Sequence, residues 1–161
     1  MRAMGDSPTW LSPEERVAWL SFDLGSRLID EALDQQMQRD SAMPHTYYAI
    51  LVMLAKSEGR SLRMSQLAQL LRFSPSRLTH AVASLERSGW VRRERCAEDR
   101  RGQTAVLTAA GSTALVGAAP GHVAEVRRVL FDALSDEQVR QLGSIFTSVS
   151  EHLGVSIDEI S

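Results

Sequence analysis

Apolar residues recur at helical spacing through the first forty residues of the chain. Ser12, Pro13 and Glu15 form a capping box with proline at the first helical position. The apolar positions that follow are Val17, Leu20, Leu24, Leu28, Ala32 and Met37, with Trp19, Phe22, Ile29 and Leu33 beside them. They cover too wide an arc for a lone surface helix. We therefore predict a long first helix that packs against several others, including helices of another subunit.

The next segment changes from amphipathic to almost wholly apolar. Residues 45–56 follow a break at Pro44, and their composition predicts a buried second helix. Leu62 and Met64 then alternate with Arg63, which indicates a short strand. A helical lobe with one strand already in place is therefore expected in the middle of the chain.

Two short helices should follow this strand. Residues 65–71 predict a compact helix with its leucines turned inward. After a tight connection, Ser74 and Pro75 repeat the cap-and-proline start of a helix, which should run to about residue 88 and end at Gly89.

The hydrophobic period changes after Gly89. Residues 90–95 and 104–107 read as two strands joined by a polar turn at 97–103. A further helix should begin after the cap at Thr108, and Pro120 within it predicts a kink or break. A last capping box opens the final helix, whose apolar positions are Val139, Leu142, Ile145, Phe146, Val149 and Leu153.

Composition narrows the class of protein. The chain has 161 residues, of which 43% are apolar, which suits one ordinary domain or one subunit of an oligomer. No apolar run is long enough to span a membrane, and the first ten residues lack the pattern of a secretory signal. A single cysteine, Cys96, excludes an internal disulfide framework. We expect a cytoplasmic protein without membrane contact.

Net charge hides a strong asymmetry. The chain carries 18 Lys and Arg against 20 Asp and Glu, a formal net charge of -2. Residues 56–107 hold 11 of the cations and five of the anions, which gives +6, and the remainder therefore carries −8. A basic centre between acidic ends is typical of a nucleic-acid-binding module joined to a part that does not touch phosphates. A solvated basic face without a partner is the alternative.

The order of elements in the basic window is that of a winged helix-turn-helix. The fold class we predict is mainly α with a small β-hairpin wing and long N- and C-terminal dimerisation helices. On the helix after Ser74, a wheel of 100° per residue places Leu78, Val82 and Leu85 inward. The opposite face is polar and cationic with no carboxylate, which suits the major groove, although an ordinary basic amphipathic helix is the alternative.

The predicted DNA-binding residues lie on this helix and on the hairpin. Arg77 is suited to bidentate contact with guanine, and the adjacent arginines at the hairpin tip suit a narrow minor groove. The full set is Ser74, Ser76, Arg77, Thr79, His80, Ser84, Arg87, Arg93, Arg95, Asp99, Arg100 and Arg101. We expect double-stranded DNA as the partner.

The chain resembles the MarR family of transcriptional regulators. The resemblance rests on Asp99 and Arg101 followed by Leu107-Thr108, on the helix start at 74–79 and on its exit at 85–91. It covers residues 12–153 and implies a homodimer, joined by its terminal helices, on a pseudopalindromic operator. Arg101 would be the family's wing arginine and Asp99 its partner.

This resemblance also implies an organisation and an effector. Residues 1–43 would form the N-terminal arm and dimerisation helix, 44–108 the DNA-binding lobe, and 109–161 the C-terminal dimerisation helices. Regulators of this type, often repressors, release DNA when a small aromatic or phenolic ligand binds. The candidate ligand residues are Trp19, Phe22, Arg27, His45 and Tyr48. Packing in the dimer core is the alternative for the aromatic residues, and capping of its own helix is the alternative for His45.

Other activities find less support in the sequence. Cys96 beside Arg95 raises the alternative of thiol-based redox sensing. A winged helix used for dimerisation or protein contact, without sequence-specific DNA binding, is the second alternative. His80, His122 and His152 are scattered, and no nucleophile elbow, phosphate-cradling loop or metal signature is present. We therefore predict no catalytic residue, no cofactor and no metal.

Overall fold

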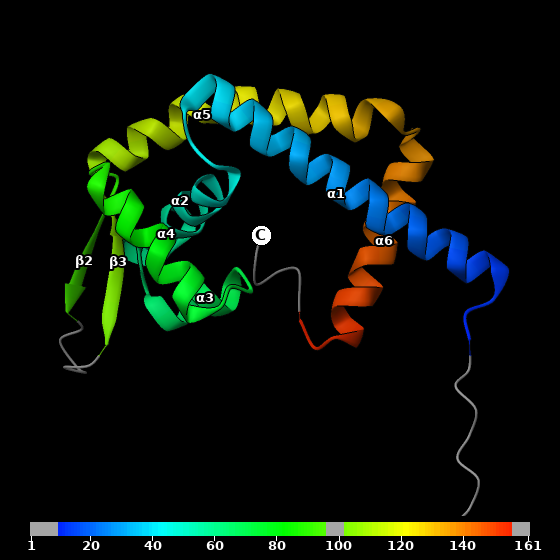
Figure 1. The fold of residues 1–161 in the computed structure, drawn as a ribbon, viewed down its shortest axis with the longest axis horizontal. Helices are drawn as coiled ribbons and strands as arrows, with labels where there is room; N and C mark the ends of the chain where they lie inside the picture. The colour runs from blue at the N-terminus through cyan, green and yellow to red at the C-terminus, as the bar shows by residue number, and fades with distance from the viewer. Residues whose placement is uncertain (1–9, 96–101, 156–161) are drawn as a thin grey trace, which may run out of the picture.

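The structure is a computed structural model that describes residues 10–95 and 102–155. Two long helices, α1 and α5, run side by side across the top of the molecule (Figure 1). A winged-helix lobe lies beneath one end of this pair and α6 lies beneath the other. The helices are α1 (Pro13–Ser41), α2 (His45–Lys56), α3 (Met64–Leu70), α4 (Pro75–Arg87), α5 (Ala109–Val129) and α6 (Asp136–His152), and the strands are β1 (Ser61–Arg63), β2 (Val91–Arg95) and β3 (Gln103–Leu107).

The N-terminal caps predicted for α1 and α6 are in place. The Ser12 hydroxyl accepts from the backbone N–H of Glu15 at 3.1 Å, and the Glu15 carboxylate accepts from the N–H of Ser12 at 2.7 Å. Ser135 and Gln138 form the same reciprocal pair at the start of α6. Each box satisfies donors that a helix N-terminus leaves open, so the starts of α1 and α6 are set locally by sequence.

Three antiparallel strands form one sheet in the order β1-β3-β2. Leu62 pairs with Ala105, and Val91 pairs with Leu107. The predicted hairpin is therefore confirmed, and the short segment at residue 62 adds its third strand. Met64 was predicted to belong to that strand but is the first residue of α3, because the strand ends where Arg63 takes the N-cap position.

The core of the lobe lies where α2, α3 and α4 meet the sheet. Ile50, Leu54, Leu67, Val82 and Leu85 are fully shielded from solvent there. Burying a leucine or isoleucine side chain contributes about 1.5–3 kcal/mol relative to leaving it exposed. This shared core fixes α4 against the sheet, so the two predicted DNA-reading elements form one rigid unit.

Of the kink or break predicted near Pro120, the break does not occur, because α5 runs unbroken from Ala109 to Val129 with the proline inside it. Pro120 and Val116, one turn earlier, are both exposed, so solvent can satisfy the carbonyl that loses its partner. Figure 1 shows α5 bending along its length instead. Two of its glycines permit close packing: a Cβ at Gly111 would lie 2.1 Å from the Trp90 carbonyl oxygen, and one at Gly121 would lie 2.9 Å from Gln36 Nε2.

Large apolar side chains remain exposed on α1 and α6. On α1, Val17, Leu20, Leu24 and Leu28 follow helical spacing, and each is more than half exposed. On α6, Ile145, Phe146 and Val149 are exposed, and this helix has no buried residue. A contiguous apolar surface of this kind marks an interaction site. The wide apolar arc predicted for the first helix is thus only partly covered within one subunit.

Candidate nucleic-acid interface

The inward and outward faces of α4 lie as the helical wheel predicts. Leu78, Val82 and Leu85 are buried in the lobe core. The Ser74 hydroxyl accepts from the backbone N–H of Arg77 at 3.2 Å, so the predicted cap is in place. Pro75 occupies the first helical turn and the positive φ of Gly89 follows the end of the helix. Cap, proline and terminating glycine together fix which residues face outward.

Most of the predicted DNA-reading side chains are exposed on α4. Ser76, Thr79 and His80 are exposed near its first turns, whereas Ser84 is half-buried. The Thr79 hydroxyl donates to the Pro75 carbonyl at 2.8 Å, which leaves its oxygen able to accept from a ligand. Positive charge and short hydrogen-bonding groups on one exposed face suit contact with base edges and phosphates.

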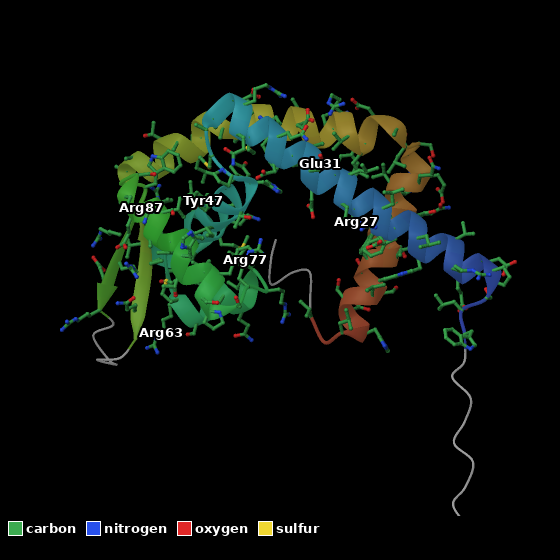
Figure 2. The ribbon with its side chains drawn as sticks, viewed as in Figure 1. Arg27, Glu31, Tyr47, Arg63, Arg77 and Arg87 are labelled. Atoms are coloured by element: carbon green, nitrogen blue, oxygen red, sulfur yellow. The ribbon has the colours of Figure 1, made fainter. Side chains whose placement is uncertain are left out.

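Arg77 turns toward α2. Its guanidinium carbon lies 4.2 Å from the centre of the Phe73 ring, and its Nη2 donates to the Thr46 hydroxyl at 3.5 Å. Figure 2 shows Arg77 near the start of α4 and Arg87 near the other end. Arg87 is held locally, because its Nη2 donates to the Ser84 hydroxyl at 2.6 Å. Both guanidiniums are therefore oriented by neighbours in the absence of DNA.

Arg93 forms an ion pair with Glu86 that sequence reasoning missed. Its Nη2 lies 2.6 Å from Glu86 Oε2, and the two side chains are 29% and 27% exposed. The hydrogen bond from Arg93 holds the pKa of Glu86 below its ordinary value. Arg92 pairs with Glu94 on the exposed side of the same strand. Arg93 thus has a structural contact that joins β2 to α4, and its contact with DNA stays a prediction.

The remaining predicted DNA-binding residues follow Arg93 in the sequence. Arg95 is exposed at the end of β2. Cys96, Asp99, Arg100 and Arg101 lie outside the described residues. The DNA-binding roles of Asp99, Arg100 and Arg101 stay predictions from sequence, and redox sensing through Cys96 stays an untested alternative.

The candidate ligand residues separate into two groups. Phe22 packs against Phe146 of α6, with ring centres 5.5 Å apart, and Trp19 packs against Phe22, with ring centres 6.0 Å apart. His45 and Tyr48 instead lie in the lobe. Figure 2 shows Arg27 on the part of α1 near α6, away from the lobe, and its Nη2 pairs with Asp23 at 2.5 Å. The five residues therefore do not line a single pocket.

His45 does not cap its own helix, contrary to one alternative. Pro44 occupies the N-cap of α2 and supplies no side-chain hydrogen bond. The backbone N–H of His45 instead donates to Asp34 Oδ1 of α1 at 2.9 Å. The cap is thus provided from another helix, eleven residues earlier, because proline has no side chain able to accept.

His122 lies beside His45 and Tyr48, a contact that the sequence did not predict. Its ring centre lies 4.4 Å from that of Tyr48 and 5.2 Å from that of His45. Spacing along the chain gives no signal for this contact, because 77 positions separate the histidines. Among the described residues, no group of three or more His, Cys, Asp or Glu side chains is arranged to hold a metal ion.

Two cavities adjoin these groups. One of about 410 Å³ lies between α1, α2 and the start of α4, and its lining includes Asp30, Asp34, His45, Phe73 and Arg77. The other, of about 350 Å³, lies between α1 and α6 and has mainly apolar walls that include Phe22, Ile29, Leu142 and Phe146. The first cavity is notable because Arg77 belongs to both the cavity and the predicted DNA-reading helix.

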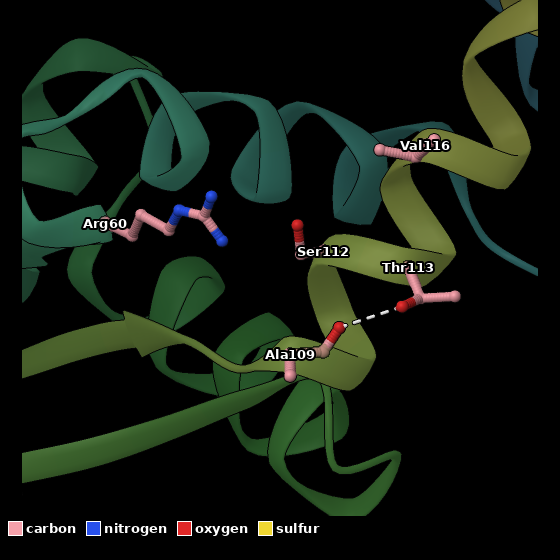
Figure 3. Close-up of a pocket in the computed structure, with 5 residues that line it drawn as sticks. All are labelled: Arg60, Ala109, Ser112, Thr113 and Val116. Atoms are coloured by element: carbon pink, nitrogen blue, oxygen red, sulfur yellow. Dashed lines mark hydrogen bonds between the residues drawn. The ribbon is translucent and has the colours of Figure 1, made fainter.

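A third hollow, of about 340 Å³, lies beside the start of α5. Figure 3 shows Arg60 reaching across it toward Ser112, while the Thr113 hydroxyl donates to the Ala109 carbonyl at 3.1 Å. Val116 completes its lining. None of the residues predicted to bind DNA or ligand lines this hollow.

Over residues 10–95 and 102–155, no helix is long and apolar enough to cross a membrane.

Known proteins share this architecture. Residues 43–102 match the model of the MarR family. Sco3205 from Streptomyces coelicolor, a MarR family transcriptional regulator whose crystal structure is in complex with DNA, is 50% identical, with 92% of this chain and 93% of that chain covered and a TM-score of 0.86. AbsC, a MarR family transcriptional regulator from the same organism, is 39% identical, with coverage of 91% and 98% and a TM-score of 0.83.

A curated relative agrees with these structures. PecS of Dickeya dadantii, an HTH-type transcriptional regulator, is 27% identical over 128 residues, which cover 80% of this chain and 76% of PecS. Proteins of this kind are regulators and not enzymes, in agreement with the lack of a predicted catalytic site. The family resemblance and the predicted fold class are thereby confirmed. This chain belongs to the MarR family of DNA-binding transcriptional regulators.

Proposed function

We propose that the protein binds double-stranded DNA sequence-specifically, with α4 in the major groove and the wing beside it. The observation that carries this proposal is the outward face of α4, where Ser76, Arg77 and His80 are exposed without a carboxylate. The lobe core holds α4 and the wing strands together, so both can meet one stretch of duplex. A related regulator with 50% identity has been crystallised with DNA, which adds support.

Within this interface, the residues have different roles. Arg77 and the short polar residues of α4 read base edges, because they lie on the exposed face near its start. Arg87, Arg93 and Arg95 approach phosphates, and the tip residues Arg100 and Arg101 reach the minor groove with Asp99 orienting them. The Ser74 cap fixes the N-terminal amides of α4, which favour a phosphate near that end.

The working unit we propose is a homodimer on a pseudopalindromic operator. The exposed apolar stripe of α1, at Val17, Leu20, Leu24 and Leu28, needs a cover that one subunit does not supply. The exposed apolar side chains of α6 enlarge the apolar surface that a second subunit would cover. Residues 1–43 and 109–161 then form the dimer, and each 44–108 lobe addresses a half-site. Two-fold symmetry requires half-sites separated by about one helical turn or a multiple of it.

Regulation by a small aromatic or phenolic ligand is part of the proposal, with the protein acting as a cytoplasmic repressor that the ligand releases. The cavity shared by His45, Phe73 and Arg77 supports it, because a ligand there would contact a DNA-reading arginine. Arg77 already faces this cavity through Thr46 and Phe73. A bound ligand that holds Arg77 in place would remove one base contact from the interface.

Selection of bound fragments from genomic or random DNA tests the proposal. Two half-site copies should be enriched as an inverted repeat with centres about 10 base pairs apart. Repeating the selection with a metabolite extract should reduce recovery of that motif if an effector is present. Recovery of no motif under either condition would contradict sequence-specific recognition.

A further inference from the structure

Three aromatic rings meet where the DNA-binding lobe joins the long helix α5. His45 and Tyr48 come from the first turn of α2, and His122 comes from the middle of α5. The Tyr48 ring lies 4.4 Å from the His122 ring, and the two imidazoles lie 5.2 Å apart. We call this group, His45, Tyr48 and His122, the ring joint. It is a direct side-chain contact between the lobe and the helices proposed to form the dimer.

The ring joint disfavours positive charge on the His122 imidazole. His122 Nδ1 is buried and has no hydrogen-bond partner among the described residues. Burial, followed by the proximity of His45, lowers the pKa of His122 below its ordinary value. Packing of the joint therefore depends on at least one neutral histidine.

The charged side chains around the ring joint either bind other partners or line the adjoining cavity. From α1, Asp34 accepts from the backbone N–H of His45, and Asp40 accepts from Gln36 Nε2 at 2.9 Å. Asp30 of α1 and Arg77 of α4 line the cavity that His45 adjoins. From α5 itself, Glu125 pairs with Arg128 at 2.6 Å. Among the described residues, no carboxylate accepts a hydrogen bond from His122 Nδ1.

We propose that the ring joint is a proton-sensitive contact that sets the position of each DNA-binding lobe relative to the dimer helices. When both imidazoles are protonated, two like charges face each other in a half-buried site, and this repulsion separates α2 from α5. The packed joint binds fewer protons than the open one, so it prevails above the ordinary histidine pKa of about 6.5. It is lost progressively as the pH falls below that value.

This proposal rests on the proposed function, because its consequence concerns DNA. In a dimer, two α4 helices must match the spacing of two half-sites. An opened joint releases α2, which packs on α4 within the lobe, and therefore alters that spacing. Acidification should thus weaken operator binding. This direction is opposite to the effect of simple protonation of the exposed His80 on α4, which would add positive charge facing DNA.

Fluorescence anisotropy on DNA from upstream of the protein's own gene, at fixed salt from pH 7.5 to 5.5, tests the proposal. Three variants enter the comparison: His122→Phe, which keeps a ring but cannot be protonated, His45→Gln, and His152→Gln, an exposed control on α6. The Kd of the wild type and of the control should rise about fivefold as the pH falls from 7.5 to 5.5, because the packed joint binds fewer protons than the open one. His122→Phe and His45→Gln should each rise less than about threefold.

NMR titration of the imidazole Cε1 protons distinguishes a failure of the ring-joint proposal from a failure of the proposed DNA-binding function. In the full-length wild type without DNA, the His122 resonance should titrate together with a change in the Tyr48 ring resonances, and this measurement does not require knowledge of the operator. If neither histidine variant reduces the pH response of binding, the ring joint does not control the lobe and the proposal is overturned. If specific binding is absent at every pH, the proposed function fails, whereas coupled titration would still show the joint.

Discussion

Arg93 of β2 donates from its Nε to Glu86 Oε2 of α4 at 2.7 Å, and its backbone N–H donates to Glu86 Oε1 at 2.8 Å. One carboxylate thus holds the first wing strand against the end of the recognition helix. Because side chain and backbone are both engaged, the contact fixes the direction in which β2 leaves α4. The two DNA-reading elements are joined by a defined polar contact as well as by the apolar core.

Glu86→Gln should lower the free energy of unfolding by about 1 kcal/mol at pH 7, because it removes a partly buried charge-assisted contact. Since Arg93 lowers the pKa of Glu86, the contribution is present above the ordinary value of 4.5. It is lost as the pH falls through the lower pKa of the folded state. Urea denaturation should therefore show a smaller difference in the free energy of unfolding between the wild type and Glu86→Gln at pH 3.5 than at pH 7. Glu94→Gln, in the exposed pair with Arg92, is the matched control and should change little.

Gly111→Ala should destabilise the protein by about 2 kcal/mol or more, because the new methyl group would overlap the Trp90 carbonyl. Gly117→Ala in the same helix has open space and should stabilise it by about 0.5–1 kcal/mol. Thermal unfolding of the two variants is the measurement. Equal shifts in Tm would contradict the close approach of α5 to the wing.

Leu24→Glu should convert the proposed dimer into a monomer, because it places a carboxylate in the exposed apolar stripe of α1. Light scattering coupled to size-exclusion chromatography measures the mass. Ala55→Glu adds the same charge at an exposed position of α2 and should leave the mass unchanged. A dimer of normal stability in the Leu24 variant would show that this stripe is not the interface.

Arg77→Ala should relax preference at one base position by about 1–3 kcal/mol of discrimination. Arg77→Lys keeps the charge but loses the planar fork, so it should restore affinity more than specificity. Binding to a set of operators with single base changes checks both. Unaltered base preference in the alanine variant would assign Arg77 to the cavity it shares with His45, and not to base reading.

Local signals predicted the secondary structure well. Caps at Ser12, Ser74 and Ser135 act within three residues, so their sequence patterns suffice. The inward face of α4 also followed from periodicity, because amphipathic spacing reports burial directly. The sequence could not decide between a kink and a break at Pro120, because the cost of a proline depends on whether solvent can satisfy the freed carbonyl, which requires knowledge of the helix's surroundings.

Contacts between distant elements were not predictable from one sequence. Asp34 caps α2 from α1, and His122 reaches His45 across the fold, yet neither pair has a characteristic spacing. Arg93 was assigned to DNA by its charge, and only the structure shows its pairing with Glu86. Charge and residue type predict what kinds of contact a side chain can make, whereas tertiary packing determines which partner it contacts.

Salt-titrated binding is the most direct test of the central claim that α4 and the wing read a specific operator. The wild-type protein should bind DNA from upstream of its own gene about a thousandfold more tightly than a shuffled duplex of the same composition. Arg101→Ala should weaken binding to both and reduce the salt slope by about one. Equal affinity for the two duplexes, together with unchanged binding by the Arg77 and Arg101 variants, would contradict the account.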